Sequence, residues 1–207
     1  MITIDKDCIY TKGKYNFKNF IHLSDEEKIM VMNWRNHINI RKWMYNESLI
    51  EKDSHFAFIR SLNDRNDCFY WLVIKNDIPI GVFSIVHIDY QKSETQPGYY
   101  LDPENEEGDG FDFIHSITQL QFEDFNVVQT AGGVLETNRY AFLHSLFLGM
   151  EISSEEYIEG KKFISGTLKK EDYYHDFEKK INPVEFFKFT MEYKKLKNIA
   201  KQQSGTP

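Results

Sequence analysis

The stretch QPGYYLDPENEEGDGF, from Gln96 to Phe111, combines two signals in 16 residues. Its first half predicts a strand that stops at a proline, and its second half predicts a loop that opens an amphipathic helix over 109–123. Glycines at a strand-to-helix turn let backbone N–H groups approach an anion, and the helix dipole favours negative charge at that point. The stretch therefore predicts a phosphate-binding loop, although Gly-x-Gly alone also fits an ordinary turn.

A second pattern follows further along the chain. We expect a strand at 127–135, then the sequence NRYA from Asn138 to Ala141, and then a helix that ends at Gly149. Strand, Gly-x-Gly loop, helix, strand and Asn-x-x-Ala in this order resemble the GNAT acyl-CoA N-acyltransferase family over roughly residues 14–168. The resemblance implies an α+β (mixed α/β) fold whose central sheet is mixed, largely antiparallel and splayed, with flanking helices. It also implies acetyl-CoA as the acyl donor.

The rest of the chain agrees with one domain of this class. The strongest strand signal covers 69–75, and its antiparallel partner is expected at 80–88. Ser24 and Glu27 have the spacing of a capping box that opens the first helix. We expect the GNAT domain to span 1–168 and a C-terminal helical extension and tail to span 169–207.

Composition excludes several other classes of protein. The net charge is −7 and no basic stripe offsets it, which argues against nucleic acid as a partner. Cys8 and Cys68 have neither disulfide-framework nor metal-ligand spacing, so we expect no metal and a reducing compartment. No apolar run is long enough for a membrane span, and the first residues lack the pattern of a signal peptide. These features predict a cytoplasmic protein without a membrane partner.

The family resemblance implies which residues hold acetyl-CoA. The strand before the loop would pair with the pantetheine amides through its backbone, as a ligand added to a sheet edge. The loop and the first turn of its helix would hold the pyrophosphate, with Asn105 where the family commonly has Arg or Gln, and Asn138 would bond near the thioester. The implied cofactor-binding residues are Tyr100, Leu101, Asn105, Gly108, Asp109, Gly110, Phe111, Asn138 and Ala141.

The acid and the base of the reaction stay open at this stage. Many GNAT proteins place a tyrosine four residues after the alanine of Asn-x-x-Ala, where it protonates the leaving thiolate. Ser145 occupies that position here, and a serine hydroxyl is a poorer acid than a phenol. Tyr140 or His144 could supply the proton instead, or solvent could do so. Candidates on the base side are Ser84 and His87, together with Glu136 and His37, and the sequence does not decide between them.

A second resemblance concerns the acceptor. The sequence WRNH at 34–37, followed by WMY at 43–45, is similar to the UDP-4-amino-sugar N-acetyltransferases of pseudaminic acid biosynthesis. An arginine beside aromatic residues suits a sugar nucleotide, because arginine pairs with phosphate and aromatic rings stack on the base or the sugar. The implied substrate-binding residues are Trp34, Arg35, Asn36, His37, Trp43, Met44 and Phe83. The expected partner is a UDP-linked amino sugar, and a homodimer is compatible with this interpretation.

Two other interpretations remain open from the sequence. A GNAT protein of similar pattern could acetylate a protein N-terminus or another small amine. The acidic loop together with Gln96 and Ser145 could also mark a non-catalytic GNAT-like binding protein. A titration with acetyl-CoA separates the last possibility from the others, because a folded protein that binds no acyl-CoA would support it.

Overall fold

The computed structural model describes residues 1–105 and 108–203, with side chains described as far as residue 198. Glu106 and Glu107, in the middle of the predicted phosphate loop, lie outside the described residues. The strands are β1 (Tyr10–Lys12), β2 (Tyr15–Asn19), β3 (Phe69–Lys75), β4 (Ile78–Asp89), β5 (Glu94–Leu101), β6 (Gln129–Leu135), β7 (Glu151–Ile158) and β8 (Lys161–Lys169). The helices are α1 (Asp25–Asn36), α2 (Ile38–Arg41), α3 (Lys52–Ser61), α4 (Gly110–Gln119), α5 (Arg139–Leu148), α6 (Lys170–Tyr174), α7 (Phe177–Lys180) and α8 (Pro183–Gln203), with short helical turns η1 (Phe20–His22) and η2 (Leu120–Asp124).

The described strands form a single mixed sheet in the order β1-β2-β3-β4-β5-β6-β8-β7. Every neighbouring pair is antiparallel except β5 and β6, which are parallel. A parallel pair needs a crossover connection, and α4 with η2 supplies it between these two strands. The predicted fold class, a largely antiparallel mixed sheet flanked by helices, is confirmed.

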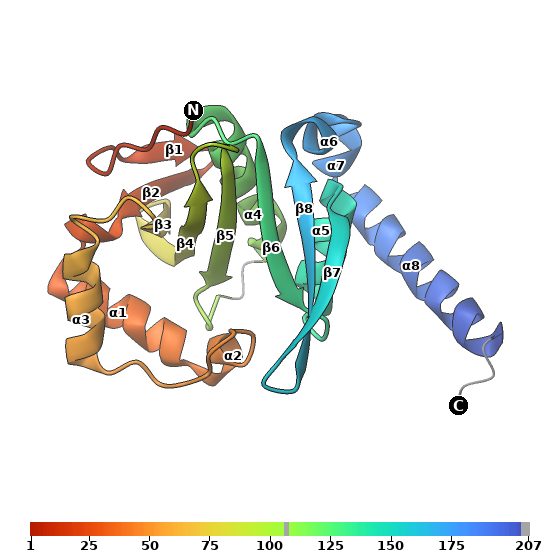
Figure 1. The fold of residues 1–207 in the computed structure, drawn as a ribbon, viewed down its shortest axis with the longest axis horizontal. Coiled ribbons are helices and arrows are strands. Elements are labelled where there is room, and N and C mark those ends of the chain that lie inside the picture. Colours follow the sequence, from red (N-terminus) through yellow and green to blue (C-terminus); the bar gives the residue numbers. More distant parts are fainter. Residues whose placement is uncertain (106–107, 204–207) are drawn as a thin grey trace.

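The sheet opens between β5 and β6. Their pairing consists of Glu94 with Gln129 and Thr95 with Thr130, after which the strands separate. β6 then stays paired with β8 along all seven of its residues. Figure 1 shows β5 and β6 close together at one end and diverging towards α2 at the other. The expected splay is therefore present, and the edge of β5 that faces β6 is unpaired from residue 96 onwards.

Alternating side chains give the sheet two covered faces. Trp71 and Phe83 lie in the cluster packed against α4 and η2, whereas Leu72 and Val82 lie in the cluster packed against α1 and α3. This alternation follows from the two-residue period of a strand. The two helical layers therefore lie on opposite faces of the sheet. The splay is the place where the sheet does not separate these two faces.

Local sequence signals set the ends of the helices that border the splay. Ser24 and Glu27 form the predicted capping box at the start of α1. Asn138 caps α5 by accepting a hydrogen bond from the backbone N–H of Ala141, and Gly149 ends the same helix with φ of 108°. A left-handed residue at this point favours glycine. Both ends of α5 are thus fixed by residues that the sequence identified.

The C-terminal part packs on the body before α8 extends away from it (Figure 1). Tyr173 of α6 belongs to the main core, and Phe186 of α8 packs against α5. Asn182 and Pro183 open α8 as expected, and the Asn182 side chain accepts a hydrogen bond from the Val184 N–H. Among the described helices, none is long and apolar enough to cross a membrane.

Candidate active site

A cavity of about 740 Å³ occupies the splay. Phe58 of α3 lines it from one face of the sheet, and Ile117 of α4 and Ala141 of α5 line it from the other. Backbone and side chains of residues 96–100 in β5 and 130–135 in β6 form its walls. Because both helical layers contribute to its lining, the cavity reaches from one face of the sheet to the other.

Eight of the residues predicted from the sequence meet in this cavity. They come from both sides of the splay and from five different segments of the chain. The lining includes Arg35, Trp43, Met44, Ser84, Tyr100, Asn138, Ala141 and Ser145. The structure therefore brings part of the expected donor side and part of the expected acceptor side into one space.

The predicted phosphate loop leads from β5 to the first turn of α4. Gly108 has φ of 70°, a conformation that glycine adopts without strain, and a Cβ at this position would meet no atom within 4 Å. Gly110 is the first residue of α4, and its missing Cβ would lie 3.4 Å from the Tyr140 hydroxyl on α5. The N-terminal ends of α4 and α5 thus lie next to each other. Two helix N-termini together make a favourable place for an anion.

The Asp109 side chain points into the protein and not towards a ligand. Its carboxylate is 2% exposed, accepts hydrogen bonds from Lys75 Nζ at 2.9 and 3.1 Å, and lies 3.3 Å from Lys14 Nζ. The Tyr15 hydroxyl donates a further hydrogen bond to it at 3.3 Å. Burial alone would raise the pKa of Asp109, but the two ammonium groups outweigh burial and hold its pKa below the ordinary value. Any contact of Asp109 with a cofactor would use its backbone, as would that of Phe111, whose ring is buried.

Ser145 lies on the cavity-facing side of α5. Its hydroxyl donates a hydrogen bond to the backbone carbonyl of Ala141 at 3.0 Å, so its proton is held within the helix. Tyr140 lies outside the cavity lining, beside Gly110, and burial raises the pKa of its phenol. Neither side chain is arranged in this structure as an obvious donor to a leaving thiolate.

His144 is corrected from a candidate acid to a packing residue. Its ring is completely buried behind α5, stacked between Phe111 at 5.1 Å and Phe186 at 4.7 Å between ring centroids. Neither ring nitrogen has a hydrogen-bond partner in the described part of the chain. Desolvation lowers the pKa of His144 to about 3, so the ring is neutral at ordinary pH. It has no route to the cavity.

Arg35 is the cation on the opposite side of the cavity. Its Nη2 donates a hydrogen bond to the backbone carbonyl of Asn46 at 2.7 Å, while its Nη1 is buried without a partner among the described residues. Desolvation lowers the pKa of this guanidinium, although arginine remains charged. A buried, partly unsatisfied guanidinium in a cavity is suited to an anionic group of a ligand.

Residues 42–50, which we call the strap, connect α2 with α3 and border the cavity. Asn36 holds the strap through two hydrogen bonds with the backbone of Ile50, at 2.8 and 2.9 Å. Arg41 donates to the backbone carbonyl of Glu47 at 3.1 Å, and Lys161 of β8 forms an ion pair with the Glu47 carboxylate. The strap therefore has contacts with both halves of the sheet.

Four residues that were predicted to bind the acceptor do not line the cavity and instead support the fold around it. Trp34 is buried in the core beneath α1, and Phe83 is fully buried in the main core, 5.2 Å from the Trp71 ring. His37 caps α2 by accepting a hydrogen bond from the Asn39 N–H at 3.2 Å. Asn36 contributes through the strap. These placements correct the expectation that all of them line the acceptor pocket.

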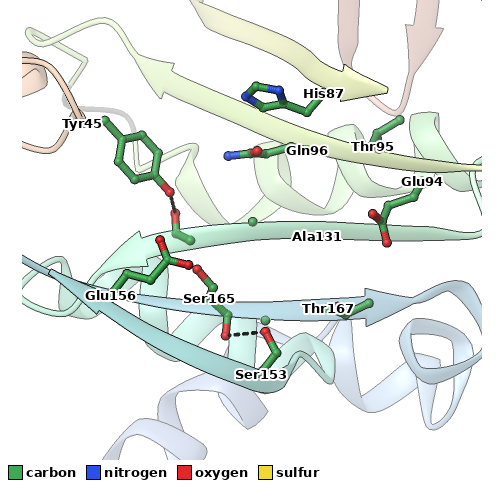
Figure 2. A pocket seen from close by; sticks show the side chains of 13 residues that line it. Tyr45, His87, Glu94, Thr95, Gln96, Ala131, Ser153, Glu156, Ser165 and Thr167 are labelled. Atoms are coloured by element: carbon green, nitrogen blue, oxygen red, sulfur yellow. Dashed lines mark hydrogen bonds between the residues drawn. The ribbon is translucent and has the colours of Figure 1, made fainter. Parts of the chain in front are cut away.

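A second pocket of about 450 Å³ adjoins the cavity at the strap (Figure 2). Three residues that border both spaces are Tyr45, His87 and Gln96, and the pocket also contains Glu94 and Glu156. The sequence indicated His87 only as one of several candidate bases and assigned no site role to Tyr45. Both spaces are also lined by three consecutive small residues of β6, Ala131, Gly132 and Gly133. This run of small side chains is the feature of the sequence that could have indicated a cavity beside β6.

Comparison with known proteins identifies relatives of this arrangement. No family model matches the chain. Acetyltransferase PseH of Campylobacter jejuni subsp. jejuni serotype O:23/36 is 30% identical over 155 residues, which cover 75% of this chain and 94% of that protein. The crystal structure of Campylobacter jejuni N-acetyltransferase PseH in complex with acetyl coenzyme A matches with a TM-score of 0.60 at 24% identity, over 75% of this chain and 99% of that one. Spermidine N-acetyltransferase from Vibrio cholerae, solved with CoA and spermine, matches with a TM-score of 0.69 at 15% identity, over 77% and 98%.

Proposed function

Because the chain belongs to the PseH-like acetyltransferases of the GNAT family, we propose that it transfers an acetyl group from acetyl-CoA to the amine of a nucleotide-linked 4-amino sugar. The observation that carries the proposal is the cavity in the splay, which is lined by the start of α5 on one face and by the half-buried Arg35 on the other. The predicted phosphate loop does not line this cavity, but Gly110 at its end lies beside Tyr140 at the start of α5. This arrangement gives the donor and the acceptor separate approaches to one reaction point.

The donor would lie on the α4–α5 face. Its pyrophosphate would bind backbone N–H groups of Gly108 and Gly110, and its pantetheine would pair with the free edge of β5 near Tyr100 and Leu101. The acidic composition of the loop is less of an obstacle than the sequence indicates, since the Asp109 carboxylate is buried against lysines. Asn138, which lines the cavity from the start of α5, would lie near the thioester.

The acceptor would lie on the α1–α3 face, under the strap. We assign Arg35 to a phosphate of the nucleotide, because one of its nitrogens is buried and unpaired in the described structure. Trp43 and Met44 would contact the apolar part of the sugar. A protein N-terminus has no comparable anion to place beside Arg35, and this favours the sugar nucleotide among the possible amines.

In the reaction, the amine nitrogen would attack the thioester carbonyl and form a tetrahedral intermediate. A backbone N–H of β5 would stabilise the oxyanion, since that edge of the strand has no partner after Thr95. Collapse of the intermediate would break the C–S bond, form the amide and release CoA. The step needs a base for the amine proton and a proton for the departing thiolate.

A thiol-release assay tests this function. Purified protein is incubated with acetyl-CoA and a panel of UDP- and dTDP-linked 4-amino sugars, with free amino sugars, a polyamine and a peptide amine as comparison acceptors. We expect turnover with a UDP-linked 4-amino sugar and acetylation of its amine by mass spectrometry. Preference for the polyamine or the peptide would refute the assignment of a sugar nucleotide as the acceptor. Absence of acetyl-CoA binding would refute the proposed acetyltransferase activity.

We further propose that the enzyme is a cytoplasmic homodimer. The outer face of α8 exposes Val184, Phe187 and Met191, and its later turns carry lysines, whereas the sheet-edge strand β7 is acidic and exposes Tyr157. A second copy offers a surface of opposite charge to each of these elements. Light scattering during size-exclusion chromatography tests the assembly, and Phe187→Glu should shift it towards the monomer. The free thiols of Cys8 and Cys68 agree with a reducing compartment.

A further inference from the structure

His87 occupies an irregular place in β4. The strand pairs Val86 with Gln96 and then Asp89 with Glu94, so two residues of β4 stand opposite the single residue Thr95. This is a β-bulge, a feature that re-aims a side chain beside many active sites. His87 also has φ of 49°, a left-handed conformation that only a few per cent of non-glycine residues adopt.

The bulge coincides with the apex of the splay. Thr95, the residue opposite the bulge, is also the last residue of β5 that pairs with β6. From this position the His87 side chain borders both the central cavity and the adjoining pocket. Figure 2 shows its imidazole above Gln96, on the side of the pocket from which Tyr45 enters. The strained residue thus stands where the two strands part and where an acceptor would meet the thioester.

We propose that His87 is the general base that accepts the proton of the acceptor amine, an inference that rests on the proposed acetyl transfer. Within the described part of the chain its ring has no hydrogen-bond or ion-pair partner, so a ring nitrogen is free to accept. Ser84, another base candidate from the sequence, donates its hydroxyl proton to the backbone carbonyl of Gly98 at 3.1 Å. A serine hydroxyl held in this way is a poor proton acceptor.

The smaller pocket that His87 borders also contains acidic side chains. Glu94 and Glu156 line the smaller pocket with it, and the Tyr45 hydroxyl points to the backbone of β6 (Figure 2). The Glu94 carboxylate accepts a hydrogen bond from the Gln129 amide and stays on this side of the sheet. In the larger cavity the charged or titratable side chains besides His87 itself are Arg35, Tyr45, His55, Tyr70, Tyr99 and Tyr100. Two carboxylates in its lining give the smaller pocket a negative potential.

The step balances without another reactant. The amine nitrogen uses its lone pair to form the N–C bond with the thioester carbonyl, and the attacking nitrogen loses one proton to His87. The C–S bond breaks with its electron pair on sulfur, and the thiolate takes a proton from solvent. His87 then returns its proton to solvent as the acetylated product leaves.

The decisive variant is His87→Gly. Glycine adopts positive φ without strain, so the bulge and the fold should persist, and the space left by the ring can admit free imidazole. We expect kcat to fall about 100-fold or more, in the range of a lost general base. Added imidazole should restore a measurable part of the rate, and acetyl-CoA affinity by calorimetry should stay unchanged. His87→Gln should lose the acid limb of the pH–rate profile and should not be rescued.

His175→Gln is the matched control, because His175 is exposed and lies outside both cavities. The variants are assayed with whichever amine of the panel the wild-type enzyme acetylates, so the base is tested even if the acceptor differs from a sugar nucleotide. A His87→Gly enzyme with kcat within threefold of wild type would refute the role of His87 as general base and would leave the proposed acetyl transfer standing. Loss of rate without imidazole rescue, together with weaker acetyl-CoA binding, would make His87 structural. No transfer to any amine by wild type would overturn both proposals.

Discussion

The Tyr45 hydroxyl donates a hydrogen bond to the backbone carbonyl of Gly133, 3.3 Å away across the splay. The Tyr45 ring also stacks on Phe163 of β8, with 4.4 Å between centroids. Because β5 and β6 share only two residue pairs, this contact is a second connection between the two halves of the sheet. It fixes the position of the strap, and with it the side of the cavity that we assign to the acceptor.

Gly133→Ala should displace the strap. A Cβ at this position would come 2.6 Å from the Tyr45 hydroxyl and 2.9 Å from the Ser165 hydroxyl, so Tyr45 has to move. We expect the acceptor KM to rise about tenfold, equivalent to about 1.4 kcal/mol, while the acetyl-CoA KM stays within about twofold. Tyr45→Phe keeps the stacking and should have a smaller effect. An unchanged acceptor KM in Gly133→Ala would show that the strap does not position the acceptor.

Gly110→Val should weaken acetyl-CoA binding. The branched side chain would press on Tyr140 and cover the first backbone N–H groups of α4, where we place the pyrophosphate. Calorimetry should show at least a tenfold higher Kd, about 1.4 kcal/mol. Gly110→Ala is the comparison, since its Cβ would sit at an acceptable 3.4 Å from the Tyr140 hydroxyl. Equal affinity in a folded Gly110→Val protein would remove the loop from the cofactor site.

Asp109→Asn should destabilise the protein in a pH-dependent way. The pKa of Asp109 is lower in the folded than in the unfolded state, where it is about 3.9, so its carboxylate stabilises the fold above that pH. This stabilisation is lost as the pH falls through the folded-state pKa. At neutral pH the variant should lose about 3 kcal/mol of unfolding free energy, because the ion pairs that the buried Asp109 carboxylate makes with Lys75 and Lys14 are lost.

Urea titrations at neutral pH and below pH 3.9 measure this difference, which should shrink at the lower pH. Asp112→Asn is the matched control, since Asp112 also pairs with Lys14 but its carboxylate is 59% exposed. It should cost less than about 1 kcal/mol. A loss in Asp109→Asn that is the same at both pH values would mean that charge pairing is not the cause.

Arg35→Ala should raise the acceptor KM and leave the acetyl-CoA KM nearly unchanged. Removal of a charge-assisted hydrogen bond costs about 1.5–3 kcal/mol, so the rise should be tenfold or more. Arg35→Lys should recover only part of the affinity, because an ammonium cannot bind a phosphate in the bidentate geometry. Arg60→Ala on the exposed side of α3 serves as the control. If only the acetyl-CoA KM rises, Arg35 belongs to the donor side.

Ser145→Ala should reduce kcat by less than about tenfold, well below the 10²–10⁴ typical of a lost general acid. The reason is that the Ser145 hydroxyl donates its proton to Ala141 and that solvent can protonate the thiolate. Tyr140→Phe is measured beside it, because the phenol could substitute. A thousandfold loss in folded Ser145→Ala that still binds acetyl-CoA would show that the hydroxyl is essential. Ser145→Tyr tests whether the cavity admits the group that many relatives carry.

Much of the fold could be predicted from the sequence, because short local patterns determine where its strands and helices begin and end. The hairpin of β3 and β4, the capping box at Ser24 and the two ends of α5 each follow from residues within a few positions of one another. The three-residue strand β1 was missed, since so short a strand has no periodicity to detect. The proposed boundary at residue 168 stays a prediction.

The candidate site was harder to predict from the sequence than the fold, because it depends on which face of the sheet each side chain points to. Phe83 and Ser84 are neighbours that point to opposite faces of β4, and the sequence does not say which face meets the cavity. At His87 the β-bulge interrupts the alternation of side chains between the two faces of β4. The hydrophobic pattern of the sequence does not predict such a bulge. His144 was misplaced for a different reason: Phe186, which covers it, lies 42 residues further along the chain and in another helix.

The cavity that crosses the sheet has a consequence for the rate law of the enzyme. If the donor binds on one face and the acceptor on the other, as we propose, neither substrate blocks the entry of the other, and both can be bound at once. Initial rates measured against one substrate at several fixed concentrations of the other should then give intersecting reciprocal plots. No acetylated form of the protein would accumulate between half-reactions, because the group would pass directly from sulfur to nitrogen inside the sheet.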